Sequence, residues 1–412
     1  MRSRSVCFGP QNLFSRKVSE VVGKRPEEIE GDRGWNTAWP FRLPIKVNTA
    51  GYERINKPVE VDLDFAQLRK TLGRNVAFSP ASIRLVETDN RGTALDEQVA
   101  FQFDPIAGDN PGEGILTFML NGITPANATR HFYLYFGSPT GDYSSPAVRP
   151  QVSLTDNVID EEQESFKVVT QNATYFYHKR GAGFSSMVDI DGQDWLGYHP
   201  GGGSAGEYRG IPNMGHPEGY CHPGMTVSRS QIIGAGPLKV SILSRSNDGK
   251  MACRWDIFPH YARLTVLKMR TPYWFLYEGT PGGNPGGRLD EEHGYCVRST
   301  GAQTPLAQKW EGAIPAPEWL YFGAGNTKRV IYLVHHEADD AIDSYWPMEN
   351  NMTVFGFGRL GLAKFMDQVP AHFTIGFAED GDFAAAARVI ESAYRELIVT
   401  VRTPEQASSE YF

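Results

Sequence analysis

One stretch, EYRGIPNMGHPEGYCHPG at residues 207–224, gathers side chains that could move protons and bind anions. The chain has only ten histidines, and His216 and His222 both lie here. The stretch also carries one cation and two phenol rings: Arg209, Tyr208 and Tyr220. It has no regular hydrophobic period, so it is neither a helix nor a buried strand. Its prolines and glycines favour a stiff, tightly turned backbone, which suits the wall of a site and equally a long structural loop.

Carbohydrate chemistry would use these residue types together. An enzyme that acts on glycans needs a proton carrier near neutral pH, donors for hydroxyl or carboxylate groups, and aromatic faces for pyranose rings. His216 and His222 are the candidate proton carriers, and Arg209 is the candidate donor. Tyr208 and Tyr220 are the candidate rings, and the first of them could also protonate a leaving group. The alternative is that both histidines are structural.

A basic segment follows at residues 254–270, RWDIFPHYARLTVLKMR, whose one acid is Asp256. In a chain of net charge -8, such a local excess of cations suits an anionic ligand, for example a uronate. We assign Arg254 and His260 to substrate binding and Tyr261 to proton donation. The alternative is that these cations only protect strand edges.

The run YWFLYEG ends in a carboxylate beside a glycine-rich loop. Strand alternation places Trp274 and Glu278 on one face of this strand. Glu278 is therefore a candidate general acid or base, and Trp274 is a candidate for substrate binding. The alternative for Glu278 is a pairing with a nearby arginine.

Two adjacent histidines occur in LVHHEADDAIDSYW. His335 and His336 point to opposite faces if the strand continues through them, which weakens a zinc site because catalytic zinc needs three convergent ligands. We keep His336 as a substrate-binding candidate. The acidic residues that follow could hold a divalent cation, but we expect no metal and no cofactor.

The elements that must position these groups are strands. The chain has 412 residues, a formal net charge of -8 and 12% aromatic residues, so it can bury a large core in two or three domains. Its acidity argues against nucleic-acid and anionic-membrane partners. The N-terminus has the charged start of a signal peptide but lacks the apolar centre, so no export signal is expected.

Alternating apolar and polar runs separated by glycine, proline, asparagine and aspartate predict an all-β protein. We expect a leader at 1–38, a β-sandwich module at 39–140, a linker at 141–164 and a large antiparallel domain at 165–412. A closing helix is expected near the C-terminus, where DFAAAARVIESAYRELI has helical spacing.

The run GAGFSSMVDIDGQDWLGYHPGGG resembles the hairpin that opens galactose-mutarotase-like supersandwich domains. The segment from FRLPIKVNTAGYERINKPVEVDL to RHFYLYFG resembles the small β-sandwich modules that precede catalytic domains in carbohydrate-processing proteins. These resemblances imply an N-terminal β-sandwich followed by a large antiparallel β-supersandwich, and an oligo- or polysaccharide ligand.

The leading hypothesis is a polysaccharide or oligosaccharide lyase that cleaves next to a uronate by β-elimination. Arg209 or Arg254 would neutralise the carboxylate, His216 or His222 would be the base, and Tyr208 or Tyr261 the acid. One alternative is a glycoside hydrolase that pairs Glu278 with Glu207 or Asp340. A sugar epimerase and a non-catalytic glycan-binding protein remain further alternatives.

Overall fold

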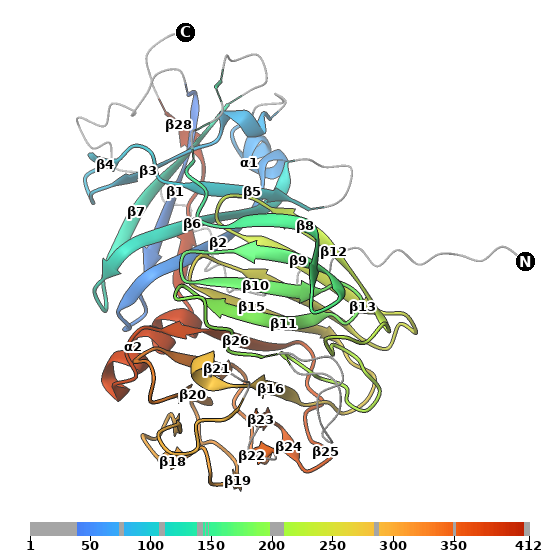
Figure 1. The fold of residues 1–412 in the computed structure, drawn as a ribbon. Helices are drawn as coiled ribbons and strands as arrows, with labels where there is room; N and C mark the ends of the chain where they lie inside the picture. Colours follow the sequence, from blue (N-terminus) through green and yellow to red (C-terminus); the bar gives the residue numbers. More distant parts are fainter. Residues whose placement is uncertain are drawn as a thin grey trace, which may run out of the picture. The chain divides into compact units, whose positions relative to one another are not determined.

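The computed structural model describes residues 39–73, 78–106, 112–137, 143–144, 146, 148–197, 210–283, 288–348 and 352–407. The chain divides into two compact units (Figure 1): Met1–Arg149 with Glu396–Phe412, and Pro150–Arg395. No helix in these described ranges is long and apolar enough to cross a membrane.

The smaller unit is a sandwich of two antiparallel sheets. The six-stranded sheet has the order β27-β1-β7-β3-β4, with β28 also paired to β1. Its strands are β1 (Phe41–Asn48), β3 (Arg84–Thr88), β4 (Ala94–Asp96), β7 (Thr129–Phe136), β27 (Ile398–Val401) and β28 (Glu405–Gln406). The three-stranded sheet comprises β2 (Arg54–Asp64), β6 (Glu113–Thr124) and β5 (Phe101–Pro105).

Period-two patterning explains this sandwich. In β1 the side chains of Phe41, Leu43, Ile45 and Val47 are buried, and they join a core shared with the three-stranded sheet. Helix α1 (Phe65–Thr71) follows β2 directly, because the Asp64 carboxylate accepts from the first free backbone N–H groups. A short 3₁₀ turn, η1 (Pro80–Ser82), precedes β3.

A nine-stranded antiparallel sheet is the largest layer of the second unit, in the order β12-β13-β14-β15-β26-β21-β20-β17-β18. Its strands are β12 (Ser228–Ala235), β13 (Val240–Ser246), β14 (Ala252–Ile257), β15 (Tyr261–Lys268), β17 (Tyr295–Arg298), β18 (Gln303–Pro305), β20 (Trp319–Gly323), β21 (Val330–His335) and β26 (Ala371–Ala378).

Two four-stranded sheets face this large sheet. One has the order β11-β10-β9-β8, made of β8 (Ser153–Asp160), β9 (Gln163–Val169), β10 (Ala173–His178) and β11 (Gly183–Asp189). The other, called here the small sheet, has the order β16-β23-β22-β19, made of β16 (Phe275–Gly279), β19 (Trp310–Gly312), β22 (Asp343–Met348) and β23 (Met352–Phe357). A hairpin of β24 (Arg359–Leu360) and β25 (Ala363–Lys364) follows β23, and the 3₁₀ turn η2 (Pro281–Gly283) follows β16.

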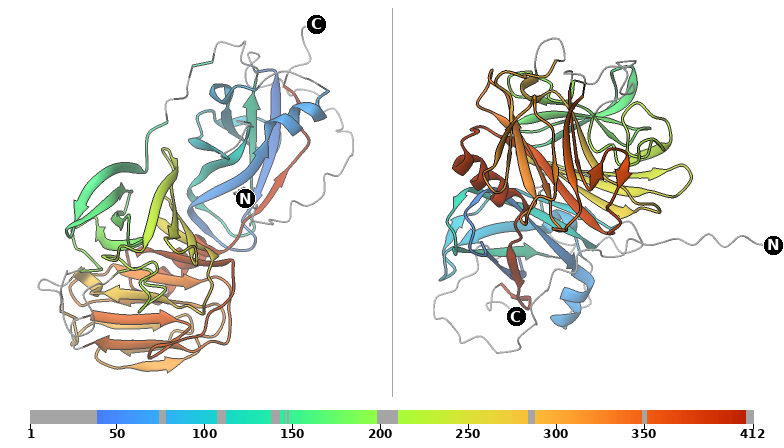
Figure 2. Two further views of the ribbon diagram at one scale, coloured as in Figure 1. Left: turned by 90° about the vertical axis from the view of Figure 1, so that its right-hand side faces the viewer. Right: turned by 90° about the horizontal axis from the view of Figure 1, so that it is seen from below.

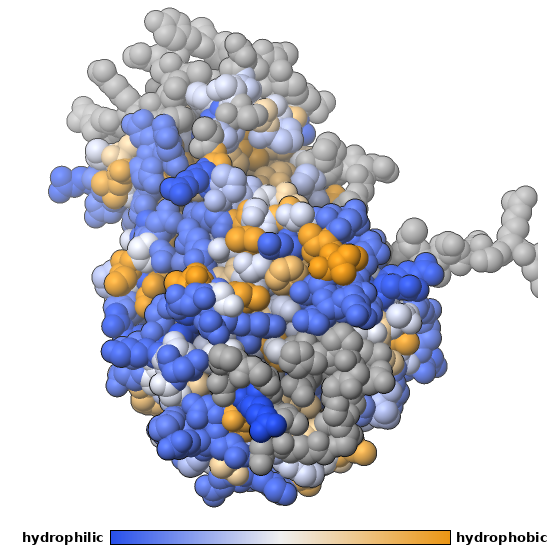
Figure 3. Space-filling model, viewed as in Figure 1, coloured by the Kyte–Doolittle hydropathy of each residue, from blue (hydrophilic) through white to orange (hydrophobic). Residues whose placement is uncertain are grey.

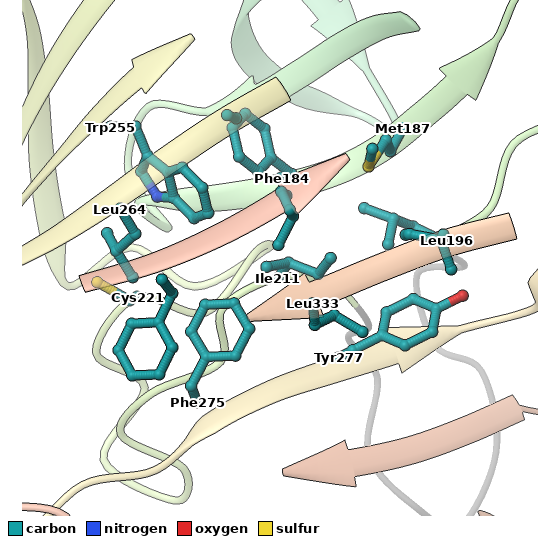
Figure 4. Packing of buried hydrophobic residues seen from close by; sticks show 14 of the residues in the cluster. Phe184, Met187, Leu196, Ile211, Cys221, Trp255, Leu264, Phe275, Tyr277 and Leu333 are labelled. Carbon is teal, nitrogen blue, oxygen red and sulfur yellow. The ribbon is translucent and has the colours of Figure 1, made fainter. Parts of the chain in front are cut away.

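One hydrophobic core joins the three sheets of the larger unit. Figure 4 shows side chains from several strands meeting in it, among them Phe184, Trp255, Phe275 and Leu333. The opposite face of the large sheet is covered in part by helix α2 (Phe383–Tyr394), whose Ala386 and Ile390 pack against a second cluster (Figure 2). On the face shown in Figure 3, the described surface is mostly hydrophilic, with hydrophobic side chains in small separate groups.

The predicted all-β sandwich fold with a short helix near the C-terminus is confirmed. Its last strands are a difference, since β27 and β28 follow α2 and pair with β1 in the smaller unit.

The segment predicted as a linker, 141–164, is also different, because β8 lies within it and pairs with β9. Its acidic composition suggested a linker, yet the acids are spread over a hairpin: Asp156 and Asp160 lie in β8, Glu161 and Glu162 in the turn, and Glu164 in β9. Glu161 and Glu162 both have positive φ and form the two-residue turn, without the Asn-Gly or Asp-Gly pair that signals such turns.

Candidate functional site

The segment Gly210–Met214 joins the two four-stranded sheets into one layer. On one side, Phe184 of β11 donates its N–H to the Ile211 carbonyl at 2.7 Å. On the other side, the N–H groups of Leu276 and Glu278 in β16 donate to the carbonyls of Pro212 and Gly210 at 2.9 and 3.1 Å. The first residues of this stretch therefore act as a short connecting strand rather than as a free loop.

Glycine is required where this segment begins. Gly210 has φ +141°, and a Cβ there would lie 2.1 Å from the Phe184 carbonyl oxygen. Asn213 also has positive φ, at 26°, a region in which asparagine is more common than most residues. The resulting break in alternation lets Ile211 and Met214, three residues apart, both reach the core.

The Asn213 side chain instead reaches Glu278 on the outer face of the small sheet. Its Nδ2 donates to Glu278 Oε2 at 2.7 Å, and the backbone carbonyl of Asn213 accepts from Trp274 Nε1 at 2.8 Å. All three residues are buried, with Glu278 8% exposed. Phe275 and Tyr277 point the other way, into the core, so the predicted alternation of this strand is observed.

Two cations lie over the Trp274 ring. Arg359 and Lys364 are directly opposite each other in the β24–β25 hairpin. The Arg359 Cζ is 5.6 Å and the Lys364 Nζ is 5.2 Å from the ring centroid. Trp274, predicted as a candidate for substrate binding, is 1% exposed, so its ring has no free face for a ligand in this structure. The ring instead supports the two cations.

Arg359 is a buried guanidinium. It is 5% exposed, its Nη1 makes contacts of 3.5 Å to Ser344 Oγ and 3.4 Å to the Val354 carbonyl, and its Nε has no hydrogen-bond partner among the described residues. Burial lowers the pKa of Arg359, while the nearby Glu278 carboxylate raises it. A guanidinium with an unused donor is suited to a carboxylate or phosphate group.

The space for Arg359 comes from a glycine. A Cβ on Gly356 would lie 2.4 Å from Leu276 Cδ2 and 2.8 Å from Arg359 Cδ. Because β23 has no side chain at this position, the arginine stem can lie flat on the sheet.

His216 lies near the same cations. Its pKa is lowered, first by burial and then by the charge of Lys364, with a smaller effect of Arg359. Glu218 works in the opposite direction, and its carboxylate accepts from Lys364 Nζ at 2.7 Å. The imidazole of His216 is therefore neutral at neutral pH and able to accept a proton. We call the set His216, Asn213, Trp274, Glu278, Arg359 and Lys364 the Glu278 cluster.

His222 is adjacent to this cluster but more enclosed. Its ring lies 5.9 Å from that of His216, and its Nδ1 is 3.1 Å from the Pro223 carbonyl. Burial lowers the pKa of His222 to about 4, so it stays neutral at physiological pH. Tyr220 is also nearby in sequence, but its hydroxyl donates to Asp248 Oδ2 at 2.5 Å and its ring is 7% exposed.

The basic segment does not join the cluster. In β14 and β15, Cys253, Trp255 and Leu264 face the core. Arg254 and Tyr261 alternate with them and lie on the opposite face of the large sheet, so the structure does not bring either residue to His216.

Each predicted residue of this segment has structural neighbours. Arg254 Nε donates to Asp256 at 3.0 Å, and Tyr261 packs 5.3 Å from Phe258 in the cluster beneath α2. His260 lies in the turn between the strands, where its carbonyl accepts from Asn172 and burial lowers the pKa of its ring.

His336 belongs to the α2 side. Its Nε2 is 2.8 Å from Thr374 Oγ1, and its ring is 5.6 Å from that of Tyr394. The predicted opposition of the two adjacent histidines is observed, since His335 stacks on Phe373 in the main core at 4.9 Å. Tyr208 and Arg209, predicted as acid and carboxylate neutraliser, lie outside the described residues.

A second group of titratable side chains surrounds His335. Its Nδ1 is 2.5 Å from Glu318 Oε2, and both side chains are 2% exposed. Glu318 Oε1 accepts from the Asp339 N–H at 2.6 Å. Glu337 holds His372 through its Nδ1 and through its N–H, the latter at 2.7 Å. We call Glu318, His335, Glu337 and His372 the Glu318 cluster.

Three members of the Glu278 cluster were missed from sequence. Asn213 lies within the opening stretch but is neither a proton carrier nor a charge. Arg359 and Lys364 lie in GRLGLAK, which carries no motif, and only their strand pairing makes them neighbours. Among the described residues, no group of three or more histidine, cysteine, aspartate or glutamate side chains has the arrangement of a metal site.

Comparisons with known proteins add little to this geometry. No family model matches the chain, and no curated protein matches it. Among solved structures, the protein HI1317 is similar at a TM-score of 0.37 and 13% identity, over 55% of this chain and 99% of that chain. A galactose mutarotase related enzyme from Lactobacillus acidophilus is similar at a TM-score of 0.34 and 8% identity, over 53% and 98%.

The YidC insertase is similar at a TM-score of 0.32 and 10% identity, over 59% of this chain and 44% of that chain. These values amount to a weak likeness at the level of the fold, and they carry no conclusion about chemistry.

Proposed function

We propose that the larger unit is a carbohydrate-active enzyme that cleaves an acidic glycan by β-elimination at the Glu278 cluster. One observation supports this most: the cluster holds a buried guanidinium, Arg359, and an imidazole, His216, whose pKa is lowered by burial, by Lys364 and more weakly by Arg359. β-Elimination needs this pair of groups, a fixed cation for the uronate carboxylate and a neutral base for the adjacent C–H.

The step balances with these side chains. Arg359 pairs with the uronate carboxylate and lowers the pKa of the neighbouring C–H. His216 takes that proton, the electron pair forms a C=C bond to the next ring carbon, and the bond from that carbon to the glycosidic oxygen breaks. The leaving oxygen takes a proton from water or from a phenol, for which Tyr208 remains the sequence candidate.

Asn213 and Glu278 are positioning residues in this proposal. Glu278 raises the pKa of Arg359 and so keeps the guanidinium charged despite its burial. Asn213 fixes the Glu278 carboxylate by the 2.7 Å hydrogen bond. Lys364 adds a second positive charge near the ring of Trp274.

The test is incubation of the full chain with a panel of uronate-containing glycans. A lyase gives an unsaturated product with a new ultraviolet absorbance, and His216→Asn should remove it. Reducing ends without new absorbance, lost in Glu278→Gln and kept in His216→Asn, would establish the glycoside hydrolase alternative instead.

A glycan-binding protein without catalysis would behave differently again. It would retain its glycan affinity when His216 and His222 are both replaced by alanine, and it would give no product at any enzyme concentration.

A further inference from the structure

The outer face of the large sheet carries a row of cations across neighbouring strands. In the register of the sheet, Arg229 lies opposite Arg245, Arg245 lies opposite Ala252, and Ala252 lies opposite Lys268. We call Arg229, Arg245 and Lys268 the cation row. All three side chains are exposed.

These positions lie on the face that points away from the core. In β13, Val240 and Ile242 belong to the core cluster, so Arg245 faces outward by alternation. The same alternation in β14, where Cys253 faces the core, turns Arg254 outward. Arg263 in β15 is outward as well, because Leu264 is in the core.

Among the described outward-facing residues of β12 to β15, the cations outnumber the acids. Arg254 and Arg263 share one carboxylate, Asp256, at 3.0 and 3.2 Å. Within the described part of the chain, neither Arg229 nor Arg245 has a carboxylate within ion-pair distance, and Lys268 donates only to the Gly249 carbonyl, at 2.5 Å.

Asp248 is the nearest acid in the β13–β14 turn. It is already engaged by Tyr220, Ser246 and Lys250. Asp248 in the β13–β14 turn therefore does not neutralise the cation row.

A hollow marks one end of the row. It has a volume of about 400 Å³ and is lined by Arg229, Ser230, Gln231, Leu243, Arg245, Ser246 and Asn247. Two guanidinium groups and several neutral donors thus surround one concave surface. Like charges directly opposite each other destabilise a sheet, so the Arg229–Arg245 pair lowers the stability of the protein. Protection of a sheet edge needs charges on the edge strand alone and would not require this pair.

We propose that the cation row binds the acidic groups of an extended glycan, apart from the Glu278 cluster. Strand spacing of about 4.8 Å places the cations along a line rather than around a point, which suits a linear polyanion better than a single small anion. The row is selective for charge rather than for sugar type, because arginine and lysine supply donors only. The inference rests on the proposed function only for the class of ligand, an acidic polysaccharide.

The experiment compares the full chain with the double variant Arg229→Thr, Arg245→Thr. Threonine is chosen because it suits an exposed strand position. Binding to polygalacturonate and to neutral dextran is measured over a range of salt concentrations. A matched control, Arg91→Thr with Lys328→Thr, removes the same charge from exposed positions that are not part of the row.

We expect the double variant to bind polygalacturonate at least tenfold more weakly, with a shallower salt dependence, and the control to bind like the parent chain. The melting temperature of the double variant should equal or exceed that of the parent chain, because two like charges on facing strand positions are removed. Equal polygalacturonate affinity in the double variant and the control would overturn the proposal. Tighter binding of the parent chain to single-stranded DNA than to polygalacturonate, sensitive to the same substitutions, would also overturn it.

This result is separable from the proposed lyase activity. His216→Asn should keep full binding to polygalacturonate and lose turnover. Binding that depends on the row without any product from acidic glycans would contradict the lyase proposal alone.

Discussion

The Glu278 and Glu318 clusters are both buried groups of charged side chains at the edges of the same core, yet they are built on opposite principles. In the Glu318 cluster, carboxylates and imidazoles bond to each other, as in the 2.5 Å contact of Glu318 with His335. In the Glu278 cluster, two cations lie side by side, and the Arg359 Nε has no hydrogen-bond partner in the described part of the chain. In the first arrangement the carboxylates pair with imidazoles, although His335 Nε2 has no hydrogen-bond partner among the described residues either. In the second, the donor left over belongs to a guanidinium, which carries a positive charge and attracts an anion.

This contrast teaches which buried polar groups to suspect of function. Native proteins pair nearly all buried polar atoms, because an unmade hydrogen bond there is costly. A cluster in which carboxylates pair with imidazoles is expected to contribute to stability, and one in which two cations lie side by side is expected to bind an anion. Variants of the two clusters should therefore change different quantities.

The largest expected effect is on turnover. His216→Asn removes the proposed base, so kcat should fall by about 10²- to 10⁴-fold while the free energy of unfolding changes little. Product formation from uronate glycans and urea unfolding measure the two quantities. His293→Asn is the control, since that side chain is 64% exposed, and it should match the parent chain. A His216→Asn protein with parental turnover would contradict the assignment.

The next effect is on stability. Glu318→Ala leaves His335 Nδ1 and the Asp339 N–H without their acceptor inside the protein. Leaving buried hydrogen-bond donors without an acceptor costs about 1–3 kcal/mol for each donor, which urea unfolding would measure. The folded fraction should keep its kcat. Glu164→Ala, which removes an exposed partner of Lys179, should cost less than about 1 kcal/mol. If Glu318→Ala lowered kcat and left stability unchanged, the contrast between the clusters would fail.

A third effect tests the acid beside the Glu318 cluster by pH. Burial, followed by the charges of Glu318 and Asp339, raises the pKa of Asp343 to about 7. The folded protein therefore holds a proton between about pH 4 and 7 that the unfolded chain has released, so stability rises as the pH falls through this window. The contribution between pH 8 and 4.5 is about 3 kcal/mol.

In Asp343→Asn this contribution should vanish. Urea unfolding at the two pH values gives it as the difference between variant and parent. Parallel pH dependences of the two proteins would refute the role of Asp343.

The smallest effect sharpens the electrostatics of the Glu278 cluster. Lys364 lowers the pKa of His216, so Lys364→Met should raise that pKa and move the acid limb of kcat/KM to higher pH. The limb falls with decreasing pH because the base must be neutral. Lys328→Met, a change at an exposed position, should leave the profile unmoved. A limb displaced to lower pH would show that His216 is not the group that titrates.

Sequence reasoning reached the strands more readily than the site. Period-two patterns such as FRLPIKVN and YWFLYEG are set by burial of one face, so they predict strands and their inward residues from local information. The hairpin at Glu161 and Glu162 was missed, because its turn lacks the usual residues. The site depended on pairings across long sequence separations, and these are not encoded in any one window.

The candidates chosen from sequence had two different outcomes, and His216 and Glu278 illustrate the first. Their residue types drew attention, and the structure places Glu278 in β16 and His216 two residues after the segment that pairs with this strand. Arg254 and Tyr261 have equally suitable types, but strand alternation turns them to the other face of the large sheet. Arg359 became visible only through its pairing with Lys364 over Trp274. Residue type alone therefore proposes candidates, and the face of the strand decides among them.

The positive φ of Asn213 has a consequence for engineering the segment that it interrupts. The backbone at this position requires a residue that tolerates left-handed dihedrals, and the Glu278 carboxylate requires an amide donor. Glycine would tolerate the left-handed backbone but would supply no amide donor. Glutamine would supply an amide donor but would tolerate that backbone less well. The backbone conformation and the side-chain donor at this position are thus two separate requirements. A redesign of the proposed activity could remove the amide donor and keep the backbone pairing that connects the two four-stranded sheets.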